Sequence, residues 1–163
     1  MDAIFPVGTK QASAYIKDIP TSVVSLGYSN YFVLLISQCN NFGSLIKLTA
    51  NPELQKQTSR YQFDAELSDE EDIMLAKIVP HSTTFLLGNP SSSQRGLMYE
   101  LVASRVCQAI YGAKPDESRP ILIGISLKPE LVPKETELTE IQIKTSKLII
   151  DSLLELVESC KLW

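Results

Sequence analysis

The sequence has few of the residues from which small active sites are usually built. It holds one histidine, three cysteines and seven glycines in 163 residues. Because His81 is the single histidine, a metal site that needs two imidazoles is excluded. No glycine lies in the Gly-x-Gly-x-x-Gly or Gly-x-x-x-x-Gly-Lys spacing that holds a phosphate. We therefore expect no metal, no nucleotide and no other cofactor.

Paired cysteines and long hydrophobic runs are also missing. Cys39, Cys107 and Cys160 are far apart and show no Cys-x-x-Cys spacing, which favours reduced thiols. The longest apolar run, Tyr31 to Ile36, is far shorter than the roughly 18 residues that indicate a membrane span. The opening residues have neither the basic start nor the apolar stretch of a secretion signal. These absences predict a protein of the cytoplasm and nucleus with no membrane partner.

An excess of positive charge is absent as well. The 15 lysines and arginines stand against 19 acids, a net charge of −4, so we expect no nucleic-acid partner. The acidic excess is local, because seven acids and two bases lie between Glu53 and Asp72. Its densest part is the run Asp69, Glu70, Glu71 and Asp72. Consecutive carboxylates lack the spacing of a calcium loop, so this run is either solvated charge or a contact with a basic partner surface.

The first half of the sequence contains a regular alternation of apolar and polar residues, which is typical of half-buried strands. Strands are predicted at residues 11–17, 21–28, 31–39, 44–49 and 83–87. Proline in the Ile19-Pro20 step is expected to interrupt pairing. The loop at residues 39–43 contains asparagine and glycine, which tolerate positive φ, and predicts a hairpin. The first four strands are therefore predicted to form an antiparallel meander.

The second half changes to helical spacing. Apolar residues recur from Leu97 to Ile110, with Ser91 as the predicted N-cap and Gly112 as the stop signal. A strand at residues 121–127 follows. The buried stripe of the last helix is predicted to contain Ile141, Ile149, Leu153, Leu156 and Cys160 and to continue to Trp163. The order β-β-β-β-insertion-β-α-β-α predicts an α+β fold, a mainly antiparallel sheet with two helices packed on it.

Residues from about 51 to 80 interrupt this order. The segment is too polar to bury enough apolar surface to offset the entropy of ordering it. We interpret it as an exposed, mobile acidic insertion in a single domain of residues 1–163. Within it, residues 73–76 form either one helical turn or a short docking segment.

The run Tyr31 to Ile36 is apolar on both faces of the predicted strand. An antiparallel strand usually shows one face to water, so both faces of this strand need cover. The two helices can cover one face, and either a second layer of this chain or a partner subunit covers the other. We select Tyr31, Val33 and Leu35 as candidate partner-binding residues, together with the acids at 69–72. When the protein is alone, we expect either a homodimer or mild aggregation.

One short motif resembles a catalytic one. Gly124-Ile125-Ser126 is similar to the start of a nucleophile elbow, but Lys128 replaces the second glycine and Pro129 blocks the helix that should follow. A hydrolase would require Ser126 to be an exposed nucleophile. We therefore predict no catalytic residue and no enzyme activity.

Five short pieces stand out in this order: Ile19–Val24, Tyr31–Gln38, Gly43–Leu48, Thr84–Gly88 and Cys160–Trp163. Together they resemble the proteasome assembly chaperone 3 family. That family has a similar Pro-Thr step between two strands, a Leu-Leu-Gly before the first helix and a cysteine close before a terminal aromatic residue. The insertion departs from the family pattern because it is longer and more acidic, so contacts through it are not carried over.

The resemblance implies a small α+β protein that is not an enzyme. It implies a heterodimer with the related proteasome assembly chaperone 4, binding to proteasome α-subunits and promotion of α-ring formation in the 20S core particle. A small adaptor subunit of a trafficking or signalling complex is the alternative, because a compact sheet with helices and a paired face is also used there.

Overall fold

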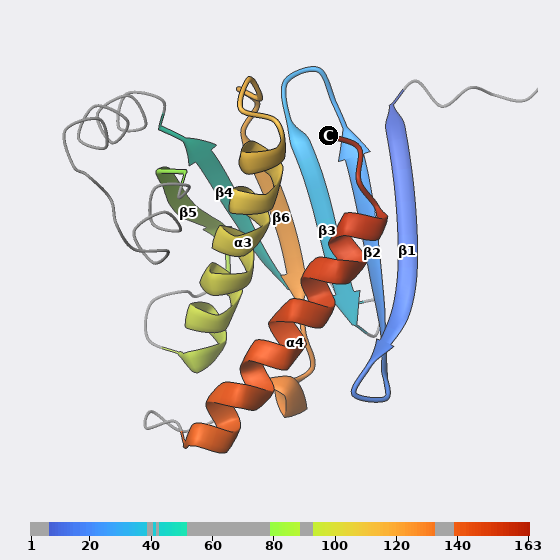
Figure 1. The fold of residues 1–163 in the computed structure, drawn as a ribbon, viewed down its shortest axis with the longest axis vertical. Coiled ribbons are helices and arrows are strands. Elements are labelled where there is room, and N and C mark those ends of the chain that lie inside the picture. Colours follow the sequence, from blue (N-terminus) through green and yellow to red (C-terminus); the bar gives the residue numbers. More distant parts are fainter. Residues whose placement is uncertain (1–6, 39–40, 42, 52–78, 89–92, 133–138) are drawn as a thin grey trace, which may run out of the picture.

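The computed structural model describes residues 7–38, 41, 43–51, 79–88, 93–132 and 139–163. Along the chain these form β1 (Gly8–Ile16), β2 (Ile19–Gly27), β3 (Phe32–Gln38), β4 (Ser44–Ala50), β5 (His81–Leu87), α3 (Gln94–Ala113), β6 (Ile121–Ser126), the short 3-10 helix η1 (Pro129–Leu131) and α4 (Glu140–Ser159). Both α-helices lie against the same face of one sheet (Figure 1). The predicted α+β class, with a mainly antiparallel sheet and two packed helices, is confirmed.

The six strands of the sheet are ordered β1-β2-β3-β6-β4-β5. The first three strands form the predicted antiparallel meander. The predicted pairing of β3 with β4 is wrong, because β6 lies between them, parallel to β3 and antiparallel to β4. Ile121, Ile123 and Ile125 are buried under the helices and β6 has no charged residue, as a central strand requires.

The hairpin between β1 and β2 is tighter than the sequence indicated. Lys17 and Asp18 both have positive φ, 48° and 63°. Positive φ at both central residues belongs to the type I′ turn, whose twist matches that of the flanking strands. Pro20 does not interrupt pairing as predicted but lies in register with Tyr15. It is tolerated because it is close to the turn, at the start of its strand.

Helix α3 begins and ends at other residues than predicted. Its N-cap is Ser93, whose hydroxyl accepts a hydrogen bond from the main-chain N–H of Gly96 at 3.2 Å. The predicted N-cap, Ser91, lies outside the described residues. Gly112 lies inside the helix, so the predicted stop is also wrong. The helix ends at Ala113 because Lys114 precedes a proline, and that position disfavours the helical conformation.

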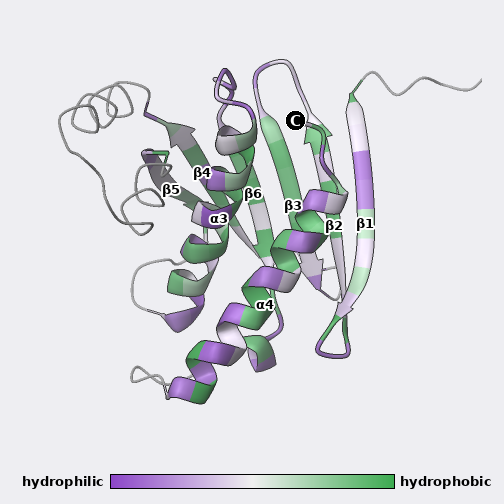
Figure 2. Ribbon diagram, viewed as in Figure 1, coloured by the Kyte–Doolittle hydropathy of each residue, from purple (hydrophilic) through white to green (hydrophobic). Residues whose placement is uncertain are grey.

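The core lies between the helices and one face of the sheet. Among its fully buried side chains are Val106 and Ile110 of α3, Leu153 of α4, and Leu34, Ile36 and Ile123 of the sheet. Hydrophobic residues are concentrated on β3 and β6, whereas β1 is much less hydrophobic (Figure 2). Among the described residues, no helix combines the length and hydrophobicity that crossing a membrane requires.

Three residues of the predicted helical stripes are outside this core. Ile141 is 77% exposed, because the first turns of α4 run past the end of β6 (Figure 1). Leu97 and Leu101 of α3 are also exposed, since the side of the helix that carries Val102 and Val106 faces the sheet. Apolar spacing alone did not distinguish the buried side of these turns from the solvent side.

The C-terminal residues close the core, as predicted, but not by extending the helix. Helix α4 ends at Ser159, and Trp163 then packs edge-on against the buried Phe32 with ring centroids 5.4 Å apart. The Cys160 thiol is buried and lies 3.6 Å from the Val23 carbonyl oxygen, to which it donates. The tail is therefore attached to β2 and β3, far from it in sequence.

Candidate protein-binding face

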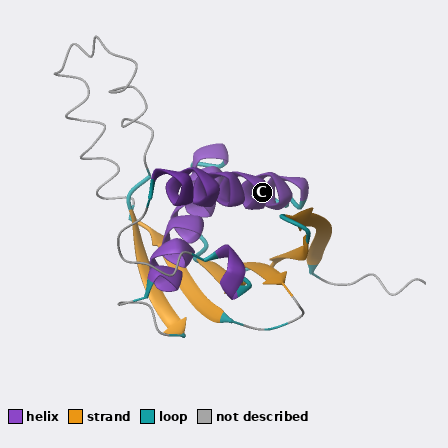
Figure 3. Ribbon diagram, turned by 90° about the horizontal axis from the view of Figure 1, so that it is seen from below, coloured by secondary structure: helices purple, strands orange, loops and turns teal. Residues whose placement is uncertain are grey.

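One face of the sheet has no cover among the described residues (Figure 3). Phe32, Leu34 and Ile36 of β3 are buried under the helices, whereas Val33 and Leu35 between them are only half-buried. Successive strand residues point to opposite faces, so Val33 and Leu35 point to the uncovered side. We call this side of the sheet the open face.

The pairing registers arrange the open face in rows that cross the strands. One row contains Val24, Leu35, Gly124 and Leu45, and the next contains Leu26, Val33, Leu122 and Lys47. A third row, at one end, contains Ser13, Ser22, Ser37 and Ser126. The open face therefore has an apolar centre next to a polar row, the arrangement found in protein interfaces.

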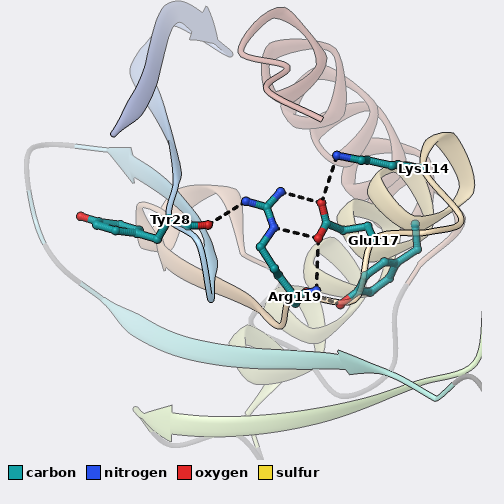
Figure 4. A network of polar contacts seen from close by, with 5 residues as sticks. Tyr28, Lys114, Glu117 and Arg119 are labelled. Carbon is teal, nitrogen blue, oxygen red and sulfur yellow. Dashed lines mark hydrogen bonds and ion pairs between the residues drawn. The ribbon is translucent and has the colours of Figure 1, made fainter. Parts of the chain in front are cut away.

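Tyr31, the third predicted partner-binding residue of this run, is half-buried and lies directly before β3. The main-chain N–H of Tyr28 donates to the Tyr31 carbonyl at 2.9 Å and closes the turn between β2 and β3. The Tyr28 carbonyl accepts a hydrogen bond from Nη1 of Arg119 at 2.7 Å (Figure 4). This turn is thereby tied to the connection between α3 and β6.

Glu117 is at the centre of the network that holds this end of the sheet (Figure 4). Its carboxylate accepts hydrogen bonds from Nε of Arg119 at 2.7 Å and from the Arg119 main-chain N–H at 3.1 Å. Nζ of Lys114 lies 3.6 Å from the same group. The side-chain hydrogen bond from Arg119 lowers the pKa of Glu117 from its ordinary 4.5 to about 2. Glu117 therefore stays ionised at all physiological pH values.

The other candidate partner-binding residues, Asp69, Glu70, Glu71 and Asp72, lie outside the described residues, as does most of the predicted insertion.

The structure describes the two ends of the predicted insertion. The main-chain N–H of Asn51 donates to the Pro80 carbonyl at 2.9 Å. The Gln108 side chain of α3 bonds both main-chain groups of Val79, at 2.6 and 2.9 Å. The segment therefore begins and ends at one place, where β4 and β5 adjoin α3.

Ser126 and the single histidine, His81, lie at opposite ends of the strands. Ser126 ends β6 on the open face. His81 begins β5 in register with Ala50, at the opposite end of the strands, and its Nδ1 lies 3.0 Å from the Val79 carbonyl oxygen. Burial raises the pKa of the Cys107 thiol to about 12, so it stays protonated. Ser126 and His81 therefore do not form a nucleophile and its base.

Sequence reasoning found the part of the open face on β3 and missed the parts on β2, β4 and β6. Val24, Leu45 and Leu122 alternate with buried residues, so the period of two could have assigned them to the same side. What the sequence did not show was the strand order, which places these residues next to Val33 and Leu35.

The fold defines the chain as an α+β protein in which two helices cover one face of a six-stranded mixed sheet. No family model matches the sequence, and no curated protein is similar to it.

Solved structures do share the fold. One similar chain belongs to a structure described as a novel chaperone complex for yeast 20S proteasome assembly. The TM-score is 0.53 and the sequence identity 10%, and the match covers 91% of this chain and 98% of that chain. At this identity the likeness is one of fold.

Proposed function

We propose that this protein is a non-catalytic assembly chaperone of the 20S proteasome. It pairs with a related chaperone through the open face, binds proteasome α-subunits and promotes α-ring formation, in the cytoplasm and nucleus. The observation that carries the proposal is the apolar open face, which no described part of the chain covers. The shared fold with a chain of a proteasome assembly chaperone complex and the five sequence pieces support a related chaperone as the proposed partner.

The size of the open face suits a stable pair. Its six strands, spaced at about 4.8 Å and paired over about seven residues of about 3.3 Å, give an area of roughly 650 Å². Each partner in an interface of standard size buries about 800 Å². The largest apolar patch on a typical monomer, about 300–600 Å², is often a functional surface.

The pairing is tested with a charge on the open face. Leu35→Glu places a carboxylate in the centre of the face, and a buried unpaired charge costs several kcal/mol. We expect this variant to keep its thermal midpoint and to lose the related chaperone on co-expression. The matched control is Leu148→Glu, because Leu148 is 62% exposed on α4 and points away from the face. Equal loss of the partner in both variants would contradict the use of the open face.

The proposed binding to proteasome α-subunits is tested by co-purification from cell extract, with identification of the bound proteins by mass spectrometry. Proteasome α-subunits that bind the wild type support the proposal. Coat subunits or regulators of GTPases in their place would identify the protein as an adaptor of a trafficking or signalling complex. A serine-directed activity probe that labels the wild type and not Ser126→Ala would instead identify a hydrolase.

A further inference from the structure

The six strands contain two charged residues, Lys10 and Lys47. Lys10 is on the side of the helices, where its Nζ donates to the Lys161 carbonyl at 2.6 Å. Lys47 is on the other side. It alternates with the fully buried Ile46 and Leu48 and lies in register with Leu122 on β6. Lys47 is therefore the one charged residue that the strands present on the open face.

The surroundings of Lys47 are apolar on one side and polar but uncharged on the other. Leu122 lies on one neighbouring strand and Thr84 on the other. Within the described part of the chain no carboxylate forms an ion pair with Lys47. Its side chain is half-buried even without a partner. A surface that covers the open face would remove most of the remaining water from its ammonium group.

We propose that Lys47 determines which chain covers the open face, an inference that rests on the proposed pairing of that face. The cover carries an aspartate or glutamate opposite Lys47 and is a different chain. A second copy of this protein is disfavoured, because the strands of its own open face offer hydroxyl and apolar groups and no carboxylate.

The physical basis is the cost of desolvating an unpaired charge. A self-paired dimer is symmetric and would bury two ammonium groups against strands that carry no counter-charge. The penalty after relaxation is several kcal/mol for each ion, comparable to much of the gain from burying the apolar centre. A carboxylate on a different partner removes this penalty by ion pairing. Lys47 therefore lowers the affinity for the wrong partner more than it raises the affinity for the right one. Many specific interfaces distinguish between partners in this way.

The length of the lysine side chain offers a competing outcome. β4 is separated from the edge of the sheet only by β5, so the ammonium group could reach water past Thr84 while its stem stays on the apolar surface. In that case neither self-pairing nor partner choice would depend on Lys47.

The test is the self-association of the full chain without any partner, measured by sedimentation equilibrium. Lys47→Met keeps the length of the side chain and removes its charge, and we expect it to lower the self-dissociation constant at least tenfold. Lys47→Gln, which stays polar, should lower it less. The matched control is Lys147→Met on the exposed side of α4, which should leave self-association unchanged. Thermal midpoints of all variants establish that they fold.

Self-association that is equally weak, or equally tight, in the wild type and in Lys47→Met overturns the proposal. So does an equal increase in Lys47→Met and Lys147→Met. In a second measurement, the amount of co-expressed related chaperone that co-purifies should fall at least tenfold with Lys47→Glu. It should recover when the partner's opposing acid is changed to lysine. Neither measurement involves α-subunits, so failure here is distinct from failure of the proteasome function.

Discussion

Gly43 shows how one small residue permits the strand order. A methyl group at this position would collide with the carbonyl oxygen of Ile125 and lie 3.0 Å from Cα of Ser126. Both contacts are to the main chain of β6, which cannot move without breaking its pairing. We expect Gly43→Ala to destabilise the protein by about 1–3 kcal/mol, measured by urea unfolding.

The matched control for this prediction is Gly112→Ala. No atom lies within 4 Å of the position that a methyl group would occupy at Gly112, which is inside α3. Alanine favours a helix over glycine by about 0.5–1 kcal/mol, so this variant should be as stable as the wild type or more so. If both variants unfold at the same urea concentration, the close approach of Gly43 to β6 is not needed.

The ion pair of Glu117 with Arg119 predicts a specific pH dependence. The pKa of Glu117 is lowered to about 2 in the folded protein, from its ordinary 4.5. A lowered pKa stabilises the fold fully above about pH 4.5, and this contribution is lost as the pH falls from about 4.5 to about 2. Glu117→Gln should therefore lower stability at pH 7 by about 2–3 kcal/mol and flatten the pH dependence in that range.

Thermal unfolding at several pH values measures this effect. The control is Glu158→Gln, because Glu158 forms an exposed ion pair with Lys161 at 3.7 Å. Exposed pairs contribute about 0–1 kcal/mol, so this variant should follow the wild type. A Glu117→Gln variant with the same acid unfolding curve as the wild type would contradict the assignment.

The C-terminal tail after α4 is predicted to be part of the core. Deletion of Leu162 and Trp163 should cost about 2–4 kcal/mol, as other large truncations of buried side chains do. Trp163 is the only tryptophan, so its fluorescence reports on this site and should be blue-shifted and protected from quenchers. A thermal midpoint unchanged by the deletion, with emission typical of water, would refute the packing.

Trp163→Phe is a conservative variant to compare with the deletion of Leu162 and Trp163. Phenylalanine keeps the edge-on contact with Phe32 and removes the indole N–H, which has no hydrogen-bond acceptor among the described residues. We therefore expect it to lose much less stability than the deletion. This difference separates aromatic packing from any specific role of the nitrogen.

The connection between β4 and β5 is predicted to be dispensable for folding. Asn51 and Pro80 already meet through a hydrogen bond of 2.9 Å, so a loop of four or five glycine-rich residues in place of 52–78 can join the strands. Its thermal midpoint should stay close to that of the wild type. Gln108→Ala should destabilise more, because it removes the acceptor of the Val79 main-chain N–H and one of the hydrogen bonds to the Val79 carbonyl.

At the scale of the whole molecule, the acidic run predicts the rate at which the protein associates with a proteasome α-subunit. If Asp69, Glu70, Glu71 and Asp72 attract a basic surface of an α-subunit, their replacement by Asn and Gln should slow association at low salt and reduce its salt dependence. Stopped-flow mixing at two salt concentrations measures both effects. An unchanged association rate at low salt would show that the run is only solvated charge, and a large fall in thermal midpoint would show a structural role instead.

The sequence by itself determined the elements, the α+β class and the two apolar sides of β3. These features depend on residues close together in the chain: a period of two shows which strand residues share a side, and a spacing near four shows a helix. Val33 and Leu35 were assigned to a second, partner-facing side for this reason. The sequence also excluded two-imidazole metal sites and the common phosphate loops, since the number of histidines and the spacing of the glycines decide those.

Only the tertiary structure decided the strand order and the extent of the open face. Main-chain hydrogen bonds between strands are nearly independent of the side chains, so the pattern of β3 and β4 did not show that β6 lies between them. The same holds for Ile141 and Leu97, whose apolar spacing is helical but whose turns face solvent. The place of Lys47 among apolar neighbours was likewise hidden, because Leu122 is 75 residues away in the sequence and next to it in the sheet.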